Sequence, residues 1–189
     1  MADSDKKGQA PDLYADKLLQ TRSIMLSGGI DKESAEKIIK QLLILEAESN
    51  DPIKLYINSP GGDVDAGLAI FDMARFIKAP VYMIGMGLIA SAATIVLVAV
   101  PKERRLALPN SSYLIHQPMS KMEGVASDIE IYAAQLEKTR KHLNQILSDE
   151  TGQSLEVVEK DTDRDYWLDA QQALSYGLVS RIVTNIDDI

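Results

Sequence analysis

The first hundred residues alternate short apolar segments with longer amphipathic ones, and this alternation constrains the fold more than any other feature of the chain. Segments 23–27, 54–58 and 81–84 have the composition of buried strands, and each is followed by glycines and then by a segment of helical composition. In the first unit, Asp31 can cap the helix. Parallel strands need a crossover between them, so repeated strand–helix units favour a mainly parallel sheet. The sequence therefore predicts an α/β fold.

The third unit leads into the middle of the chain. Its strand is expected to end at Ile84, and a buried helix is expected to run from Ile89 until Pro101 ends it. Segments 105–109 and 113–116 have the composition of two further short strands.

A long amphipathic helix is predicted over about residues 126–150. Ser127 and Glu130 match the S-x-x-E capping box, and Gly152 is a suitable stop. The apolar side chains of this helix form one stripe, which could pack on the same domain or on another subunit, because periodicity does not name the partner. They are Ile129, Tyr132, Leu136, Leu143, Ile146 and Leu147.

Charge and composition exclude several classes of protein. The chain carries 20 Lys and Arg against 28 Asp and Glu, a formal charge of −8, which disfavours nucleic acid and anionic lipid as partners. It has no cysteine, so disulfides, thiolate nucleophiles and cysteine-ligated zinc are impossible.

Residues 1–13 are polar and show no hydrophobic periodicity, so we expect a flexible N-terminal arm there and one globular domain over 14–189.

The sequence shows no sign of a membrane segment. The longest apolar run, residues 88–100, is shorter than the roughly 20 residues that a spanning helix needs. The N-terminus lacks the apolar stretch of a secretory signal, so a cytoplasmic location is expected by default.

Ser91 is a candidate nucleophile, because it lies between two alanines where a strand is expected to give way to a helix. Small neighbours would let a carbonyl approach, and a helix N-terminus favours developing negative charge. Taken alone, however, Ser91 is more simply explained as a small residue in a buried helix. The glycines at Gly61 and Gly62 are equally ambiguous: they can aim backbone N–H groups at an oxyanion, or merely form a tight turn.

Only two histidines could serve as a general base near neutral pH. His142 lies among charged residues of the long helix and is expected to be solvated, whereas His116 lies at a strand end, where side chains can emerge into a cleft. The acidic segment 161–165 could be a solvated turn, or could supply the aspartate that fixes a histidine tautomer. It is not a calcium loop, because Tyr166 and Gln172 replace the required glycine and glutamate.

Seven short motifs, considered together, are similar in order and spacing to the ClpP family, over roughly residues 14–183. They are Tyr56-Ile-Asn-Ser-Pro-Gly-Gly62, Ala90-Ser-Ala92, Leu108-Pro-Asn-Ser111, Ile115-His-Gln-Pro118, Thr151-Gly152, Asp161-Thr-Asp-Arg-Asp165 and Tyr176-Gly-Leu-Val179.

This resemblance implies a ClpP/crotonase-like spiral of repeated ββα units with a protruding long handle helix, here about 126–150. It carries the nucleophile onto Ser91, the base onto His116 and the acid onto Asp165. The oxyanion donors would be the backbone N–H groups of Gly62 and Ala92. The family chemistry is serine endopeptidase chemistry and implies no metal or organic cofactor.

The resemblance also implies partners. Family members form stacked seven-membered rings that interlock through the handle helix, and they receive unfolded proteins from a hexameric AAA+ ATPase of the ClpX or ClpC kind. Arg164, and with it Gln117, matches positions linked to the oligomer. The chain lacks a Walker motif, so ATP would be used by the partner.

Several residues depart from the family pattern. Leu88, Ile89 and Ala92 are unusual beside the nucleophile, and Ser120, Lys121 and Met122 replace most of a glycine-rich strand that pairs with substrate. These departures indicate a divergent paralogue that works best with a second ClpP isoform. Two alternatives stay open: a weakly active or structural ring subunit, and a crotonase-type acyl-CoA enzyme.

Overall fold

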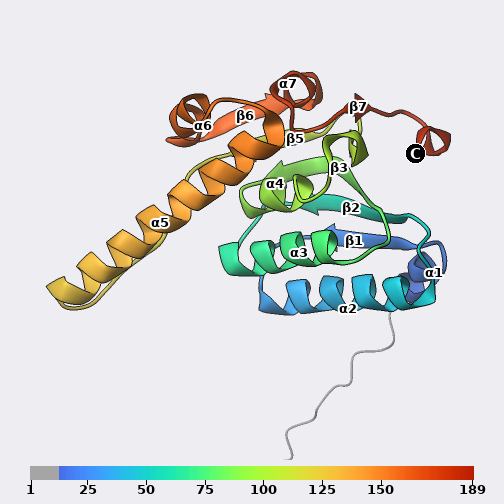
Figure 1. The fold of residues 1–189 in the computed structure, drawn as a ribbon, viewed down its shortest axis with the longest axis horizontal. Coiled ribbons are helices and arrows are strands. Elements are labelled where there is room, and N and C mark those ends of the chain that lie inside the picture. The colour runs from blue at the N-terminus through green and yellow to red at the C-terminus, as the bar shows by residue number, and fades with distance from the viewer. Residues whose placement is uncertain (1–12) are drawn as a thin grey trace, which may run out of the picture.

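A seven-stranded sheet organises the part of the chain that the computed structural model describes, residues 13–189 (Figure 1). Its strands are β1 (Ser23–Ser27), β2 (Ile53–Ser59), β3 (Val81–Ala90), β4 (Arg105–Ala107), β5 (Ser112–Ile115), β6 (Tyr166–Asp169) and β7 (Arg181–Ile182). The helices are α1 (Leu13–Gln20), α2 (Lys32–Glu48), α3 (Val64–Phe76), α4 (Ala92–Leu97), α5 (Ala126–Thr151), α6 (Leu155–Thr162) and α7 (Ala170–Tyr176). The arm expected over residues 1–13 lies outside the described residues, apart from the start of α1.

The sheet is mainly parallel, as the repeated units predict. Strands β1, β2 and β3 pair in parallel and lie one above another in Figure 1. β4 and β7 continue the sheet beyond β3, also in parallel, while β5 pairs with β3 on a separate branch. In residues 13–189, the β5–β6 pair alone is antiparallel.

β3 is longer than the sequence predicts, and the expected strand end at Ile84 is wrong. The strand continues to Ala90, with a bulge that shifts its pairing with β2 between Ile57 and Ser59. Asn58 fills the bulge: its Oδ1 accepts a hydrogen bond of 3.1 Å from the Leu88 N–H. Gly87 has a φ of +62°, and a Cβ there would lie 2.7 Å from Asn58 Oδ1. The glycines therefore make a bulge within one strand rather than a break between two elements.

The bulge gives β3 two different neighbours along one edge. Residues 83–85 pair with β4, and residues 88–90, beyond the bulge, pair with β5. The predicted helix from Ile89 therefore begins later, at Ala92, because the preceding residues are held in this second ladder.

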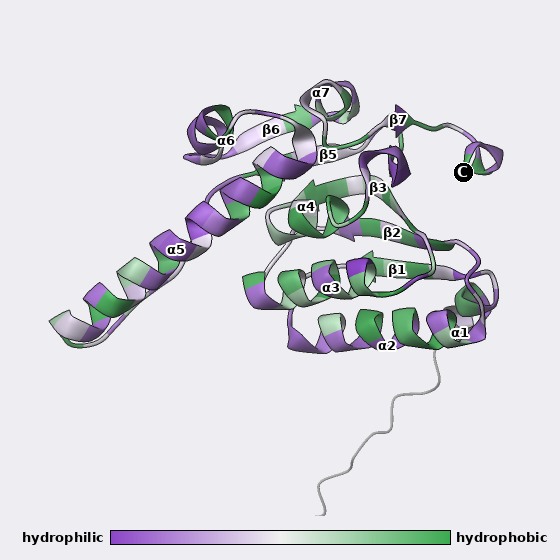
Figure 2. Ribbon diagram, viewed as in Figure 1, coloured by the Kyte–Doolittle hydropathy of each residue, from purple (hydrophilic) through white to green (hydrophobic). Residues whose placement is uncertain are grey.

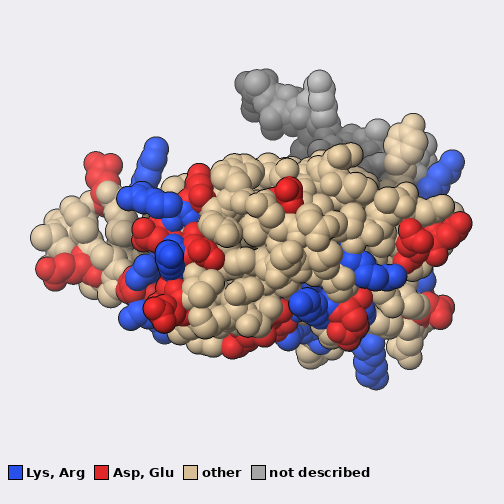
Figure 3. Space-filling view, turned by 90° about the horizontal axis from the view of Figure 1, so that it is seen from above, with Lys and Arg blue, Asp and Glu red and all other residues tan. Residues whose placement is uncertain are grey.

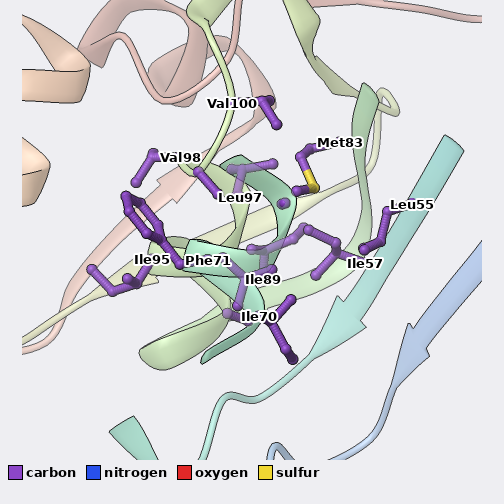
Figure 4. Close-up of a cluster of buried hydrophobic side chains, with 14 of the residues drawn as sticks. Leu55, Ile57, Ile70, Phe71, Met83, Ile89, Ile95, Leu97, Val98 and Val100 are labelled. Atoms are coloured by element: carbon purple, nitrogen blue, oxygen red, sulfur yellow. The ribbon is translucent and has the colours of Figure 1, made fainter. Parts of the chain in front are cut away.

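The core lies between the sheet and helices α2, α3 and α4. Figure 4 shows side chains of β2, β3, α3 and α4 converging in it, and Figure 2 shows the green, apolar strands at its centre. The fully buried members labelled there include Leu55, Ile57, Ile70, Met83 and Ile89.

Helix α5 projects from the rest of the molecule like an arm (Figure 1). It begins at Ala126 after Val125, with no side-chain cap, so the predicted Ser127–Glu130 capping box is wrong. It ends at Gly152 in the left-handed region, as predicted. Figure 3 shows charged side chains of both signs intermingled over the α5 end of the face in view.

The apolar stripe of α5 divides into two halves. Leu143 and Leu147 are buried on the same domain, where α5 contacts α4 and α6. Toward the other end, Ile129 and Tyr132 are 41% and 61% exposed. Packing on the same domain therefore accounts for the C-terminal half of the stripe only.

The buried end of α5 is fastened by Arg105 on β4, whose side chain is 1% exposed. Its Nε donates to the Val100 carbonyl at 2.6 Å and its Nη1 to the Glu150 carbonyl at 2.7 Å, while its Nη2 pairs with the Glu150 carboxylate. Burial lowers the pKa of Arg105, and the charge of Glu150 opposes that effect. The pair thus keeps a buried guanidinium charged and satisfied.

Replacing Glu150 by Gln should destabilise the protein, because the buried Arg105 loses its counter-charge. Breaking a buried ion pair costs roughly 3–5 kcal/mol, so Tm should fall by about 6 °C or more in differential scanning calorimetry. The matched control is Glu137→Gln on the same helix, where the ion pair with Arg140 is partly exposed. Equal Tm values for the two variants would contradict a stabilising role of Glu150 as the counter-charge of Arg105.

Candidate active site

Three neighbouring strand ends meet at one place. The order β3–β5–β6 in the sheet puts Ser91, just after β3, next to the end of β5, and the Ser91 N–H donates to the Leu114 carbonyl at 2.9 Å. The β5–β6 register pairs Ile115 with Tyr166, so one further step along the ladder sets His116 opposite Asp165. Sheet pairing alone therefore brings three residues together that are far apart in the sequence.

Ser91 occupies a strained turn between β3 and α4. Its φ of 56° and ψ of −125° make it one of two non-glycine residues with positive φ in residues 13–189. Thr94 holds the turn, since its N–H and its Oγ1 donate to the Ser91 carbonyl at 2.9 and 2.6 Å. A serine on a sharp strand-to-helix turn presents its Oγ at the top of the sheet, as nucleophile elbows do, here without the flanking glycines.

His116 bridges the other two side chains. Its Nε2 lies 2.8 Å from Ser91 Oγ, and its Nδ1 lies 3.0 Å from Asp165 Oδ1. The imidazole is 13% exposed and the Asp165 side chain 64% exposed. With the proton on Nδ1, the imidazole donates to Asp165 and leaves Nε2 to accept the Ser91 proton.

Of the two expected oxyanion donors, Ala92 directly follows Ser91, and Gly62 follows Gly61, which lies against the serine turn. Within residues 13–189, neither the Gly62 N–H nor the Ala92 N–H donates to another group. The Ser59–Gly62 loop lies tightly against the serine turn: a Cβ at Gly61 would come within 2.4 Å of the Ala90 carbonyl oxygen and 2.9 Å of the Ala92 nitrogen. This close approach fixes the loop relative to Ser91.

A small, mostly apolar pocket adjoins Ser91 and His116. Its other lining residues are Val64, Ala92, Thr94, Ile95, Ile115, Pro118, Leu143, Asn144 and Leu147. Sequence reasoning missed Asn144, which is 3% exposed and lies 2.9 Å from Thr162 Oγ1. No sequence signal marked Asn144 as buried, because a polar residue on an amphipathic helix is expected to face solvent. Of the three unusual neighbours of Ser91, Ala92 alone lines this pocket, whereas Ile89 packs in the core.

Gln117 and Arg164 lie beside the same site. The Gln117 N–H and Nε2 donate to the Thr162 and Asp163 carbonyls, both at 2.6 Å. Arg164 is exposed and lines a surface pocket with His116, Gln117 and Asp165. His142, the other histidine, is exposed on α5 and lines a different pocket, between α3 and α5.

The described part of the chain shows neither a metal site nor a membrane span. Residues 13–189 contain no group of three or more His, Asp or Glu side chains placed to hold a metal ion. No helix in the same range is long and apolar enough to cross a membrane.

Comparison with known proteins identifies the family to which this fold belongs. The Clp protease family model matches residues 5–186, so the chain belongs to the Clp protease family, a family of serine peptidases. Proteolytic subunit 2 of the ATP-dependent Clp protease of Treponema denticola is 58% identical over 179 residues, which cover 94% of this chain and 90% of that protein. Proteolytic subunit 3 of Rhizobium johnstonii is 49% identical over 194 residues, with 100% of both chains covered.

A solved structure supports the same conclusion. A ClpP1 mutant from Listeria monocytogenes has a TM-score of 0.86 and 44% identity, covering 93% of this chain and 98% of that one. The chain therefore has the ClpP fold. The numbered subunit names of the relatives fit the expectation of a paralogue.

Gly61→Ala should remove most peptidase activity, because the added Cβ would push the Ser59–Gly62 loop away from Ser91. Loss of one oxyanion donor lowers kcat roughly 100-fold or more. Gly28→Ala is the matched control: both glycines have a φ of +83°, but a Cβ on Gly28 would have no other atom within 4 Å. Both variants therefore carry the same backbone strain of about 1–2 kcal/mol. Hydrolysis of a fluorogenic peptide compares the two variants. An equal loss of activity in both would show that the close approach of Gly61 to the serine turn is not the cause of the loss.

Proposed function

We propose that this chain is a serine endopeptidase subunit of a compartmentalised, ATP-dependent protease, with Ser91 as nucleophile, His116 as base and Asp165 as the acid that orients the base. The observation that carries the proposal is the continuous hydrogen-bonded chain from Ser91 Oγ through both nitrogens of His116 to Asp165. A single peptidase domain over residues 14–189 would contain the whole constellation. Membership of the Clp protease family disfavours crotonase-type acyl-CoA chemistry.

In the proposed reaction, His116 Nε2 takes the Ser91 proton as Oγ attacks a peptide carbonyl. The oxyanion that forms lies between the N–H groups of Gly62 and Ala92, which have no internal acceptor to give up within residues 13–189. His116 then donates the proton to the leaving amine. Water, deprotonated by His116, hydrolyses the acyl-enzyme, which releases the carboxylic acid product and returns the proton to Ser91 Oγ. Asp165 stays ionised and stabilises the imidazolium, so this scheme calls for no metal or organic cofactor.

Assembly follows from the same family membership. We expect stacked seven-membered rings, unfolded proteins as substrates and an AAA+ ATPase of the ClpX or ClpC kind as the partner that uses ATP. The exposed apolar side chains of the outer half of α5, among them Ile131 and Tyr132, support a role in ring interlocking, since large exposed apolar residues on one element mark interaction sites. The family resemblance implies that Arg164 also takes part in contacts between subunits. A cytoplasmic location stays a prediction from the sequence.

The two histidines of the chain provide a clean test of the triad. His116→Ala should abolish peptide hydrolysis and labelling of Ser91 by a fluorophosphonate, because Ser91 loses its base. His142→Ala should leave both unchanged, because His142 is exposed on α5 and lines a different pocket. Ser91→Ala must remove the label entirely. Labelling that survives in the Ser91→Ala variant would disprove the proposed nucleophile.

A second assay addresses the alternative of a structural or weakly active ring subunit. If this chain is a paralogue that works best in a mixed complex, its peptidase activity should rise when a second ClpP isoform carrying an inactivated serine is added, because only the Ser91 sites can then turn over. Native mass spectrometry establishes whether mixed particles form. Formation of mixed particles with no gain in turnover would count against the mixed-complex hypothesis.

A further inference from the structure

We propose that Gln117 is a positioning residue that holds the loop carrying Asp165 against His116. This inference rests on the proposed function, because it concerns how the acid of the triad is kept in place. It assigns Gln117 a role within one subunit, as distinct from the link with the oligomer that the family resemblance suggests.

The C-terminus of α6 lies next to Gln117. This helix ends at Thr162, with Asp163 as its C-cap, and the last carbonyls of a helix have no partners within it. Gln117 satisfies two of them in succession. Its backbone N–H donates to the Thr162 carbonyl, and its side-chain Nε2 donates to the Asp163 carbonyl, each at 2.6 Å. A residue of the β5 end thus caps the helix that precedes the acid.

Asp165 lies between this cap and β6. On one side, the β5–β6 ladder ends at the pair Ile115 and Tyr166. On the other side, the bond from Gln117 Nε2 ends on Asp163, two residues before Asp165. The loop that carries the acid is therefore held at both ends by groups that flank His116 in the sequence. One stretch of chain, residues 115–117, sets the positions of both base and acid.

The acid has little else to hold it. Its side chain is 64% exposed, and within residues 13–189 its only side-chain hydrogen bond is the one to His116. Burial and packing therefore contribute little to its position, unlike that of His116, which is 13% exposed. An exposed aspartate on a loop needs its backbone fixed if its carboxylate is to stay within hydrogen-bonding distance of the base.

The first test is Gln117→Met, which keeps the length of the side chain and removes its donor. The backbone N–H bond to Thr162 remains, so the fold should be retained. A misplacement of about 1 Å can cost roughly 100-fold in rate, so kcat for a fluorogenic peptide should fall between about 10-fold and 100-fold with KM nearly unchanged. Gln145→Met, at an exposed site on α5, is the matched control and should have no effect.

Two further readouts separate positioning from assembly. Gln117→Met should keep the native mass and the Tm of the unchanged protein, whereas a residue needed for ring contacts would lower the mass or Tm along with the activity. Gln117→Asn, which retains a donor on a shorter side chain, should recover part of kcat. An unchanged kcat in Gln117→Met, or loss of activity only through dissociation of the oligomer, would overturn the inference.

A double-mutant cycle with Asp165→Asn offers the sharpest discrimination. If Gln117 acts through Asp165, Gln117→Met should cause no further loss once Asp165 is Asn, and the two effects should be strongly non-additive. The rate constant of Ser91 labelling by a fluorophosphonate serves as the readout, because it remains measurable at low turnover. An equal loss in both backgrounds would overturn the role of Gln117.

The same cycle separates this inference from the function on which it rests. If Asp165→Asn by itself leaves labelling and hydrolysis unchanged, then the proposed triad fails, whatever Gln117 does. If Asp165→Asn is strongly impaired while Gln117→Met is not, the triad stands and the positioning role is rejected.

Discussion

The bulge in β3 is the feature that allows one strand to serve two branches of the sheet. β3 pairs with β2 along one edge and with both β4 and β5 along the other. This is possible because the residues around Gly87 leave the ladder with β2, while the Asn58 side chain accepts the hydrogen bond of the Leu88 N–H. Residues 88–90 of β3 pair with β5 only beyond this shift in register. The bulge therefore links the parallel spiral to the branch that contains the proposed catalytic residues.

Beyond the bulge, the site is built from backbone pairing. The β3–β5 ladder delivers Ser91 to the end of β5, and the antiparallel β5–β6 ladder delivers Asp165 to His116. Strand ends suit this role, because their side chains face out of the sheet while the backbone stays fixed. Hydrogen bonds to Leu114 and from Thr94 maintain the strained conformation of Ser91. These bonds offset the free-energy cost of its unfavourable backbone angles.

Helix α5 extends from the pocket beside Ser91 to the solvent-exposed surface. Its inner half contributes Leu143, Asn144 and Leu147 to the pocket beside Ser91 and is fastened by the buried Arg105–Glu150 pair. Its outer half exposes apolar side chains that the rest of residues 13–189 does not cover. One continuous helix therefore lines the pocket with its inner half and exposes apolar side chains along its outer half. The hydrogen bonds of Gln117 provide a second connection, because they join the end of β5 to the end of α6, two residues before Asp165.

Sequence alone was enough to predict the α/β class, the mainly parallel pairing and the extent of the long helix, because these depend on local periodicity and on the glycines that punctuate it. Joint motif spacing also identified the ClpP family, although Ser91, His116 and Asp165 were individually ambiguous. The course of β3 past Ile84, the uncapped start of α5, the burial of Asn144 and the hydrogen bonds of Gln117 to the end of α6 emerged only in the tertiary structure. Most of these depend on a partner distant in the chain: Asn58 for the bulge, Thr162 for Asn144 and the end of α6 for Gln117. Local sequence governs how a segment prefers to fold, but such partners are set by which strands and helices meet.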